Sequence, residues 1–186
     1  MAAVAESVKR YSRFFKIQQA RAVLDYGTGT MRNAVYLARE GFSVYAADLP
    51  GQVEKLHGCP ARRHIERLLS TEELPQSRLN VDVVLSTYVF NIIMDSSGRD
   101  RYLENVTANL RPGGYLLMEV RCRQPQERCD VTCGDYFACA ECSKTLTHQE
   151  LDAVMAPHGL RRISHYYRSH AVAAIYQMTA CRSHSG

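Results

Sequence analysis

Within residues 24–50, Gly27, Gly29, Asp25 and Asp48 lie beside two short apolar runs. Gly27 and Gly29 follow the first run, and because they lack a Cβ the chain can turn tightly there and bring backbone N–H groups close to a ligand. Asp25 precedes the glycines. Asp48 ends the second run, where its carboxylate can accept hydrogen bonds from both hydroxyls of a ribose. This combination predicts a binding site for a ligand that contains a nucleoside.

Met31 indicates which class of nucleoside-containing ligand to expect. Enzymes that bind dinucleotides place a third glycine at this point of the turn, so that the pyrophosphate can sit on the N-terminus of the following helix. Here we expect the methionine side chain to crowd a diphosphate. The sequence therefore favours a nucleoside ligand without phosphates over NAD or NADP.

The segments around this turn alternate between strand and helix patterns, without an internal repeat. Such alternation predicts an α/β fold in which a doubly wound, mostly parallel sheet carries helices on both faces. Ligands bind such sheets at the carboxyl ends of the strands, where the strand order reverses. The expected strands are 21–27, 42–48, a short one near His64 and Ile65, 81–90, 112–121, 160–168 and 170–179, and the expected helices are 5–19, 31–41, 99–110 and 145–159.

Composition limits the class of protein. A chain of 186 residues with 46% apolar residues suits one compact domain over residues 1–186. The net charge of +4 is spread over separate arginine pairs with acids between them, so a nucleic-acid partner is not expected. The apolar runs are too short to span a bilayer, and the N-terminus lacks the pattern of a secretory signal. We expect a cytoplasmic protein without a membrane partner.

Four stretches together resemble class I S-adenosylmethionine-dependent methyltransferases over nearly the full length of the chain. They are "VLDYGTGT" for the cofactor loop, Asp48 for the ribose acid, "VDVVLSTYVFNII" for the fourth strand and "LRPGGYLLMEVR" for the turn into the fifth. The portion "RNAVYLAREGFSVYAADL" is similar to small stand-alone members of the tellurite-resistance and thiopurine type. The resemblance implies a seven-stranded, Rossmann-like sheet whose last strand is antiparallel.

The resemblance also implies a role for individual residues in binding S-adenosylmethionine. The loop would face the methionine moiety, Asp48 would hold the ribose, Leu49 would flank the adenine, and the end of the fourth strand would line the path from the sulfonium to the acceptor. An N-terminal helix within residues 1–20 would cap the site. The implied cofactor-binding residues are Asp25, Gly27, Thr28, Gly29, Asp48, Leu49, Ser86, Thr87 and Tyr88.

Methyl transfer requires little from side chains, because the sulfonium is already a reactive donor and alignment of the acceptor supplies most of the acceleration. A general base matters only for acceptors that lose a proton. The candidates for direct roles are Tyr11 as a lid contact, Asn91 as a residue that orients the acceptor and His148 as a base. Each has an ordinary alternative: a core tyrosine, a helix cap and a surface histidine.

The fourth strand carries "STYVF", without the Asn or Asp followed by two prolines and an aromatic residue that enzymes acting on exocyclic amines or glutamine amides tend to have. We therefore expect direct in-line methyl transfer to a small molecule. Two alternatives remain open: a methyltransferase acting on RNA or protein, and a module that binds the cofactor or a partner without catalysis. The acceptor, the atom methylated and the oligomeric state are not predicted.

Residues 121–146 form a cysteine-rich insertion between the fifth strand and the next helix. Cys129, Cys133, Cys139 and Cys142 are separated by three, five and two residues. Four thiolates can hold zinc tetrahedrally and so stabilise a loop without a core of its own. Ordinary reduced cysteines are the open alternative. A further one is that the thiolates bind a thiophilic substrate such as trivalent arsenic, and a docking role for the insertion belongs to the RNA or protein alternative.

Overall fold

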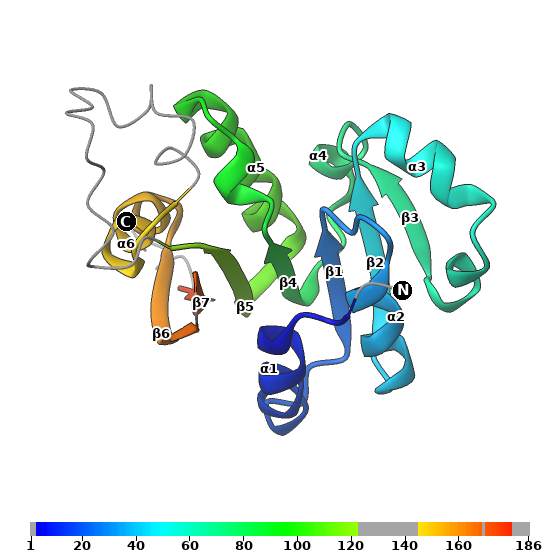
Figure 1. Cartoon of the computed structure of the whole chain (residues 1–186), viewed down its shortest axis with the longest axis horizontal. Helices are drawn as coiled ribbons and strands as arrows, with labels where there is room; N and C mark the ends of the chain where they lie inside the picture. The colour runs from blue at the N-terminus through cyan, green and yellow to red at the C-terminus, as the bar shows by residue number, and fades with distance from the viewer. Residues whose placement is uncertain (1–2, 123–144, 169, 180–186) are drawn as a thin grey trace, which may run out of the picture.

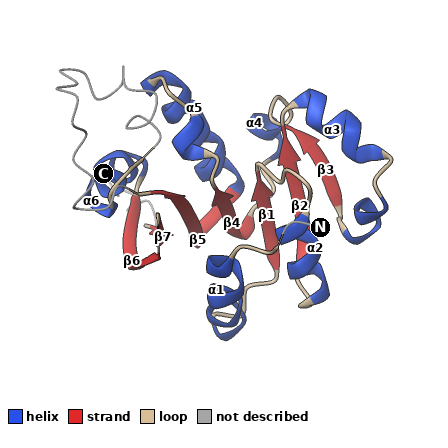
Figure 2. Cartoon of the chain, in the orientation of Figure 1, coloured by secondary structure: helices blue, strands red, loops and turns tan. Residues whose placement is uncertain are grey.

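The computed structural model describes residues 3–122, 145–168 and 170–179, and seven of its strands form one sheet (Figures 1 and 2). The strand order is β3-β2-β1-β4-β5-β7-β6. The first five strands pair in parallel, whereas β7 runs antiparallel to both β5 and β6. The strands are β1 (Ala22–Tyr26), β2 (Ser43–Asp48), β3 (Arg67–Ser70), β4 (Val81–Thr87), β5 (Leu110–Arg121), β6 (Leu160–Arg168) and β7 (Ala171–Met178).

Helices cover both faces of this sheet, and a separate apolar core lies under each. Neighbouring strand residues alternate between the two cores because successive side chains in a strand point to opposite faces. Val83 thus belongs to the core under α1 and α2, and Val84 to the core under α4, α5 and α6. The helices are α1 (Glu6–Ile17), α2 (Arg32–Arg39), α3 (Pro50–His57), α4 (Leu74–Ser77), α5 (Ser96–Asn109) and α6 (His148–Met155).

The expected fold class is confirmed, and two strands differ from their expected positions. The fourth strand ends at Thr87, because Phe90 begins a 3₁₀ turn (Phe90–Ile92). The third strand begins at Arg67, whereas His64 lies in a 3₁₀ turn (Pro60–His64) that precedes it. Burial explains the shift, because Leu69 is the fully buried residue of β3 and the strand forms around it. The last helix, α6, begins with a capping box: the Glu150 backbone N–H donates to Thr147 Oγ1 at 3.2 Å, and the Thr147 N–H donates to Glu150 Oε2 at 2.7 Å.

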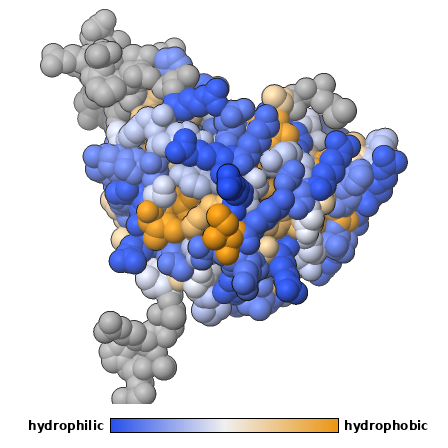
Figure 3. Space-filling model, turned by 90° about the horizontal axis from the view of Figure 1, so that it is seen from below, coloured by the Kyte–Doolittle hydropathy of each residue, from blue (hydrophilic) through white to orange (hydrophobic). Residues whose placement is uncertain are grey.

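The surface carries limited apolar patches among hydrophilic side chains, as Figure 3 shows for the face seen from below. Among the described residues, no helix is both long enough and apolar enough to cross a bilayer. The strand order reverses between β1 and β4, which lie side by side at the middle of the sheet. Their carboxyl ends are therefore the place where a sheet of this kind binds its ligand.

Candidate functional site

The glycine turn after β1 has the backbone geometry that its sequence predicts. Gly27 has φ +86° and Gly29 has φ +57°, in the left-handed region that glycine adopts without strain. A Cβ on Gly27 would lie 2.2 Å from Cγ2 of Val89, in the segment after β4. Glycine is therefore required at residue 27 for two reasons, its backbone angle and the close approach of this segment.

Met31 differs from the expectation that its side chain would crowd the ligand. The residue is fully buried and packs in the core under α1 and α2. Its φ of +59° places it in the left-handed region at the residue that precedes α2. The methionine thus takes a backbone conformation typical of glycine and directs its side chain into the core.

Asp25 is a buried carboxylate with one oxygen unsatisfied. Its Oδ2 accepts a hydrogen bond from the Thr28 hydroxyl at 2.8 Å, whereas its Oδ1 has no hydrogen-bond partner in the part of the chain that the structure describes. Burial is the main cause that raises the pKa of this carboxyl from 3.8 to about 6. A buried, unpaired carboxylate oxygen at the end of a central strand is suited to receive a cationic group of a ligand.

Asp48 closes the turn from the neighbouring strand. Its Oδ2 accepts from the Gly29 backbone N–H at 2.8 Å, and its Oδ1 accepts from the Leu49 N–H at 2.8 Å. The Gln52 side-chain amide donates to the Gly29 carbonyl at 2.7 Å. Asp48 thus holds the N–H of Gly29, and Gln52 holds its carbonyl.

A cavity of about 910 Å³ opens at this point, and we call it the glycine-loop cavity. Gly27, Asp48 and Leu49 line one side of it, and Thr87 and Tyr88 line another. Leu49 is 65% exposed, so its apolar side chain borders the cavity next to Asp48. Such a surface suits a planar base, because stacking a base on it removes apolar area from water.

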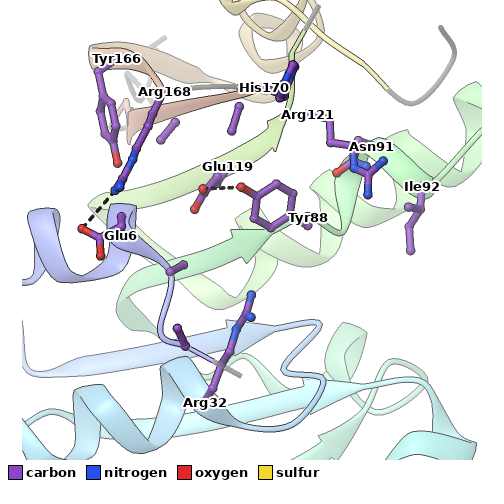
Figure 4. Close-up of a pocket in the computed structure, with 14 residues that line it drawn as sticks. Glu6, Arg32, Tyr88, Asn91, Ile92, Glu119, Arg121, Tyr166, Arg168 and His170 are labelled. Atoms are coloured by element: carbon purple, nitrogen blue, oxygen red, sulfur yellow. Dashed lines mark hydrogen bonds and ion pairs between the residues drawn. The ribbon is translucent and has the colours of Figure 1, made fainter. Parts of the chain in front are cut away.

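A second cavity of about 840 Å³ adjoins the first, and we call it the arginine cavity (Figure 4). Tyr88 and Ile92 line both cavities. The residues that line the arginine cavity are Ala3, Ala5, Glu6, Arg32, Tyr88, Asn91, Ile92, Glu119, Arg121, Tyr166, Arg168, His170, Ala171 and Ala173. The two cavities thus meet at the end of β4.

Tyr88 is held at this junction by Glu119 of β5. The Tyr88 hydroxyl donates to Glu119 Oε1 at 2.8 Å, and the hydroxyl of Ser7 donates to Glu119 Oε2. Burial, with the adjacent Glu119 carboxylate, raises the pKa of Tyr88 to about 12, so its hydroxyl stays protonated at neutral pH. Tyr88 also has φ +60°, a conformation that few residues other than glycine adopt.

A second set of hydrogen bonds ties the N-terminal segment to β4. The backbone N–H of Ala5 donates to Asn33 Oδ1 at 3.0 Å, and Asn33 Nδ2 donates to Thr87 Oγ1 at 3.0 Å. Together with the Ser7 hydroxyl on Glu119, these bonds connect the start of α1 to both cavities. A role of the N-terminal helix as a cap over the site stays a prediction.

Comparison with known families identifies the family to which this chain belongs. A model of the methyltransferase domain matches residues 2–165. The chain belongs to the methyltransferase-domain family. No curated protein matches its sequence significantly.

Solved structures share the fold of this methyltransferase. An O-methyltransferase family protein from Burkholderia thailandensis matches with a TM-score of 0.68 and 16% identity, over 94% of this chain and 56% of the other, so this chain spans just over half the length of that protein. The 1,6-didemethyltoxoflavin-N1-methyltransferase from Burkholderia thailandensis, with 1,6-didemethyltoxoflavin and S-adenosylhomocysteine bound, matches with a TM-score of 0.65 and 16% identity, over 94% and 79%. A TehB-like methyltransferase from Corynebacterium glutamicum matches with a TM-score of 0.63 and 17% identity, over 90% and 86%.

The methyltransferase brings most of the expected cofactor-binding residues to the ends of β1, β2 and β4. Thr28 is buried beside Asp25 through their hydrogen bond, and Gly27, Asp48, Leu49, Thr87 and Tyr88 line the glycine-loop cavity. Ser86 does not line it. Its hydroxyl is fully buried and accepts from the Tyr102 hydroxyl at 2.8 Å, beneath the cavity.

The three residues expected to act directly lie in different places. Asn91 lines the arginine cavity, is almost fully buried, and its Oδ1 has no hydrogen-bond partner among the described residues. Tyr11 lies in the core under α1, where its hydroxyl shares a hydrogen bond with Ser164 at 3.2 Å, and it lines neither cavity. His148 lies outside both, stacked on His165 and hydrogen-bonded through Nδ1 to the Tyr167 hydroxyl at 2.6 Å.

The cysteines expected to bind zinc, Cys129, Cys133, Cys139 and Cys142, lie outside the described residues. Within the described ranges, no group of three or more His, Cys, Asp or Glu side chains is arranged to hold a metal ion. The Leu146 backbone N–H donates to the Arg121 carbonyl at 2.8 Å. The cysteine-rich insertion thus leaves and rejoins the described chain beside the arginine cavity, because Arg121 lines it.

Two residues of the site were missed by sequence reasoning. Glu119 stands within the apolar run of β5, and Arg32 begins α2 directly after the glycine turn. A single charge inside a buried strand is the signal that would have identified Glu119, since such a residue is retained only with partners. Arg32 carries no comparable signal, because arginine is common on helices.

Proposed function

We propose that this chain transfers a methyl group from S-adenosylmethionine to a small molecule. The observation that supports this most directly is the pair of adjoining cavities that meet at Tyr88. One is lined by Gly27 and Asp48, as a nucleoside site would be, and the other has the volume of a small-molecule pocket. The 1,6-didemethyltoxoflavin-N1-methyltransferase from B. thailandensis has S-adenosylhomocysteine and 1,6-didemethyltoxoflavin bound together, which agrees with such an arrangement.

The described residues fit the cofactor at several points. Asp25 Oδ1, buried and unpaired, would receive the ammonium of the methionine moiety. Asp48 would accept from the ribose hydroxyls, and the exposed Leu49 would pack against the adenine. Arg32 begins α2 directly after the glycine turn and lines the arginine cavity, so it would bind the methionine carboxylate. The loop residues Gly27, Thr28 and Gly29 would surround this moiety.

When bound, S-adenosylmethionine supplies a methyl group on a positively charged sulfur that leaves as a neutral thioether. The protein's part is alignment and exclusion of water. Tyr88, at the junction of the cavities, would border the line along which an acceptor approaches, and Asn91 would orient it. Among the acidic residues that line the arginine cavity, Glu119 is the buried one and would take the proton of a protic acceptor.

The remaining expectations stay predictions with separate tests. Zinc at Cys129, Cys133, Cys139 and Cys142 predicts one metal ion per chain by elemental analysis, with loss of the metal in Cys139→Ser. Tyr11 as a lid contact and His148 as a base predict impaired turnover in Tyr11→Phe and His148→Gln. A cytoplasmic location is tested by fractionation. Two other functions remain as alternatives. One is a methyltransferase that acts on RNA or protein and docks through the cysteine-rich insertion, and the other is a module that binds the cofactor or a partner without turnover.

Calorimetric titration tests the proposal. We expect S-adenosylmethionine and S-adenosylhomocysteine to bind in the micromolar range, and NAD and NADP not to bind. A panel of small acceptors is then assayed by release of S-adenosylhomocysteine, with RNA and a protein extract as further acceptors. Binding of dinucleotides alone would contradict the cofactor assignment. Turnover with RNA or protein and with no small molecule would move the function to the first alternative.

A further inference from the structure

Basic side chains line the arginine cavity. Arg32, Arg121 and Arg168 line it, and His170 lies at the same end of β7 (Figure 4). Arg121 and His170 lie on one side of the cavity in this view, and Arg32 extends from the start of α2 on the other. Arginines that are far apart in the sequence therefore line the same cavity.

The acidic residues of the cavity leave part of this charge without a partner. Glu6 Oε2 pairs with Arg168 Nη1 at 3.2 Å. Glu119 accepts hydrogen bonds from the hydroxyls of Tyr88 and Ser7, and no arginine pairs with it among the described residues. In the same part of the chain, Arg121 has no ion pair. Its guanidinium is available to an anion that enters the cavity.

Asn91 gives a second, independent indication of a ligand in this cavity. It is almost fully buried, it lines the cavity, and its Oδ1 has no hydrogen-bond partner among the described residues. A buried polar atom without a partner costs free energy unless a ligand or water satisfies it. Asn91 and Arg121 both line this cavity. A ligand bound there would therefore meet a polar amide and a guanidinium together.

We propose that the methyl acceptor is a small anionic molecule, with a carboxylate or phosphate group that binds Arg121. This inference rests on the proposed methyl transfer. The planar guanidinium donates two parallel hydrogen bonds to either anion. Arg168 is already paired with Glu6, and Arg32 would serve the cofactor, so Arg121 is the arginine of this cavity that is left for the acceptor. The apolar part of the acceptor lies between Ile92 and Ala173, and its nucleophile points toward Tyr88 and the adjoining cavity.

Binding of matched probes to protein saturated with S-adenosylhomocysteine tests this proposal. The probes are benzoate and phenyl phosphate, with benzamide as the neutral isostere of benzoate and benzyl alcohol as a second neutral aromatic compound. We expect at least one anionic probe to bind in the millimolar range or tighter, and the neutral analogues to bind about tenfold more weakly or not detectably. The two anionic probes separate a carboxylate acceptor from a phosphate acceptor.

Arg121→Gln provides the matched variant, and Arg161→Gln is its control because it removes the same charge from an exposed residue of β6 that lines neither cavity. We expect Arg121→Gln to weaken the anionic probe about tenfold while the affinity for S-adenosylhomocysteine stays unchanged. The control should change neither affinity. Equal binding of neutral and anionic probes, no binding of either anion, or equal effects of the two variants would overturn the proposal.

The same experiment separates this inference from the proposed function. If S-adenosylhomocysteine does not bind, the methyltransferase function itself fails. If it binds and the neutral analogues are preferred, the function stands and the anionic acceptor is wrong. Release of S-adenosylhomocysteine in an acceptor panel built from acid and amide pairs gives a second readout of the same preference.

Discussion

Tyr88 and Glu119 are joined by two hydrogen bonds at the junction of the two cavities. The Tyr88 backbone N–H donates to the Glu119 carbonyl at 2.7 Å, and its hydroxyl donates to Glu119 Oε1 at 2.8 Å. The first bond fixes the left-handed backbone of Tyr88 against β5, and the second fixes its ring. The wall between the cavities is therefore a tyrosine whose main chain and side chain are held by one residue.

Tyr88→Phe keeps the ring and removes the hydroxyl donor. We expect the free energy of unfolding to fall by about 1–3 kcal/mol, because Glu119 is buried and loses one of its hydroxyl donors. Chemical denaturation measures this loss. Ser7→Ala, which removes the other donor, should cost a similar amount. Unchanged stability in both variants would mean that the Glu119 carboxylate does not depend on these hydroxyls.

Asp25→Asn is expected to stabilise the protein and weaken its binding of the cofactor. The pKa of Asp25 is raised to about 6 in the folded state from 3.8, so the folded state binds this proton more tightly than the unfolded state. Stability contributed by Asp25 therefore decreases as pH rises from about 4 to about 6, and by neutral pH the deficit is about 3 kcal/mol. The variant removes this deficit while it keeps an acceptor for Thr28.

Unfolding measured across pH checks the sign of this effect. The gain in stability of Asp25→Asn should be largest above about pH 6 and should disappear below about pH 4. Glu72→Gln, which neutralises an exposed carboxylate, is the control and should show no such dependence. The affinity for S-adenosylmethionine should fall in Asp25→Asn alone. A gain in stability that is independent of pH would contradict the assignment to this carboxyl.

Local sequence patterns predicted the fold and the loop, because each depended on residues close together in the chain. Gly27, Gly29 and Asp48 could be assigned a role because backbone freedom and strand ends can be inferred from short segments. Glu119 could not, since its partner Ser7 lies far away in sequence and the contact exists only after β5 packs against the start of α1. The direction of the Met31 side chain likewise depends on the packed core.

The arginines that line the arginine cavity could not be predicted from local sequence patterns either. Arg32, Arg121 and Arg168 lie on α2, β5 and β6, and their sequence contexts indicate only surface charge. Convergence follows from the strand order, in which β7 inserts between β5 and β6 and brings the ends of these strands together. A pattern read along the chain does not contain that strand order.

Gly27→Ala separates the effect of close contact from that of backbone angle. The new Cβ would lie 2.2 Å from Val89 Cγ2, and the residue has φ +86°. Gly41→Ala is a matched control, because Gly41 has φ +94° but nothing lies within 4 Å of its Cβ position. We expect Gly27→Ala to be less stable than Gly41→Ala by about 1–3 kcal/mol in thermal or chemical unfolding. Adding Val89→Ala should recover part of this difference; equal stability of the two single variants would exclude the contact.

Asp48→Ala is expected to weaken the binding of S-adenosylmethionine about tenfold or more, because charge-assisted hydrogen bonds to the ribose are lost. The variant also frees the backbone N–H groups of Gly29 and Leu49, so loop disorder is a competing cause. Gln52→Ala separates the two causes, since it releases the Gly29 carbonyl and leaves the carboxylate in place.

Calorimetry on both variants compares the loss of affinity for S-adenosylmethionine. A small loss in Gln52→Ala with a large loss in Asp48→Ala supports direct ribose binding by Asp48. Equal losses would assign the effect to the position of the loop instead, and unchanged affinity in Asp48→Ala would contradict the ribose assignment.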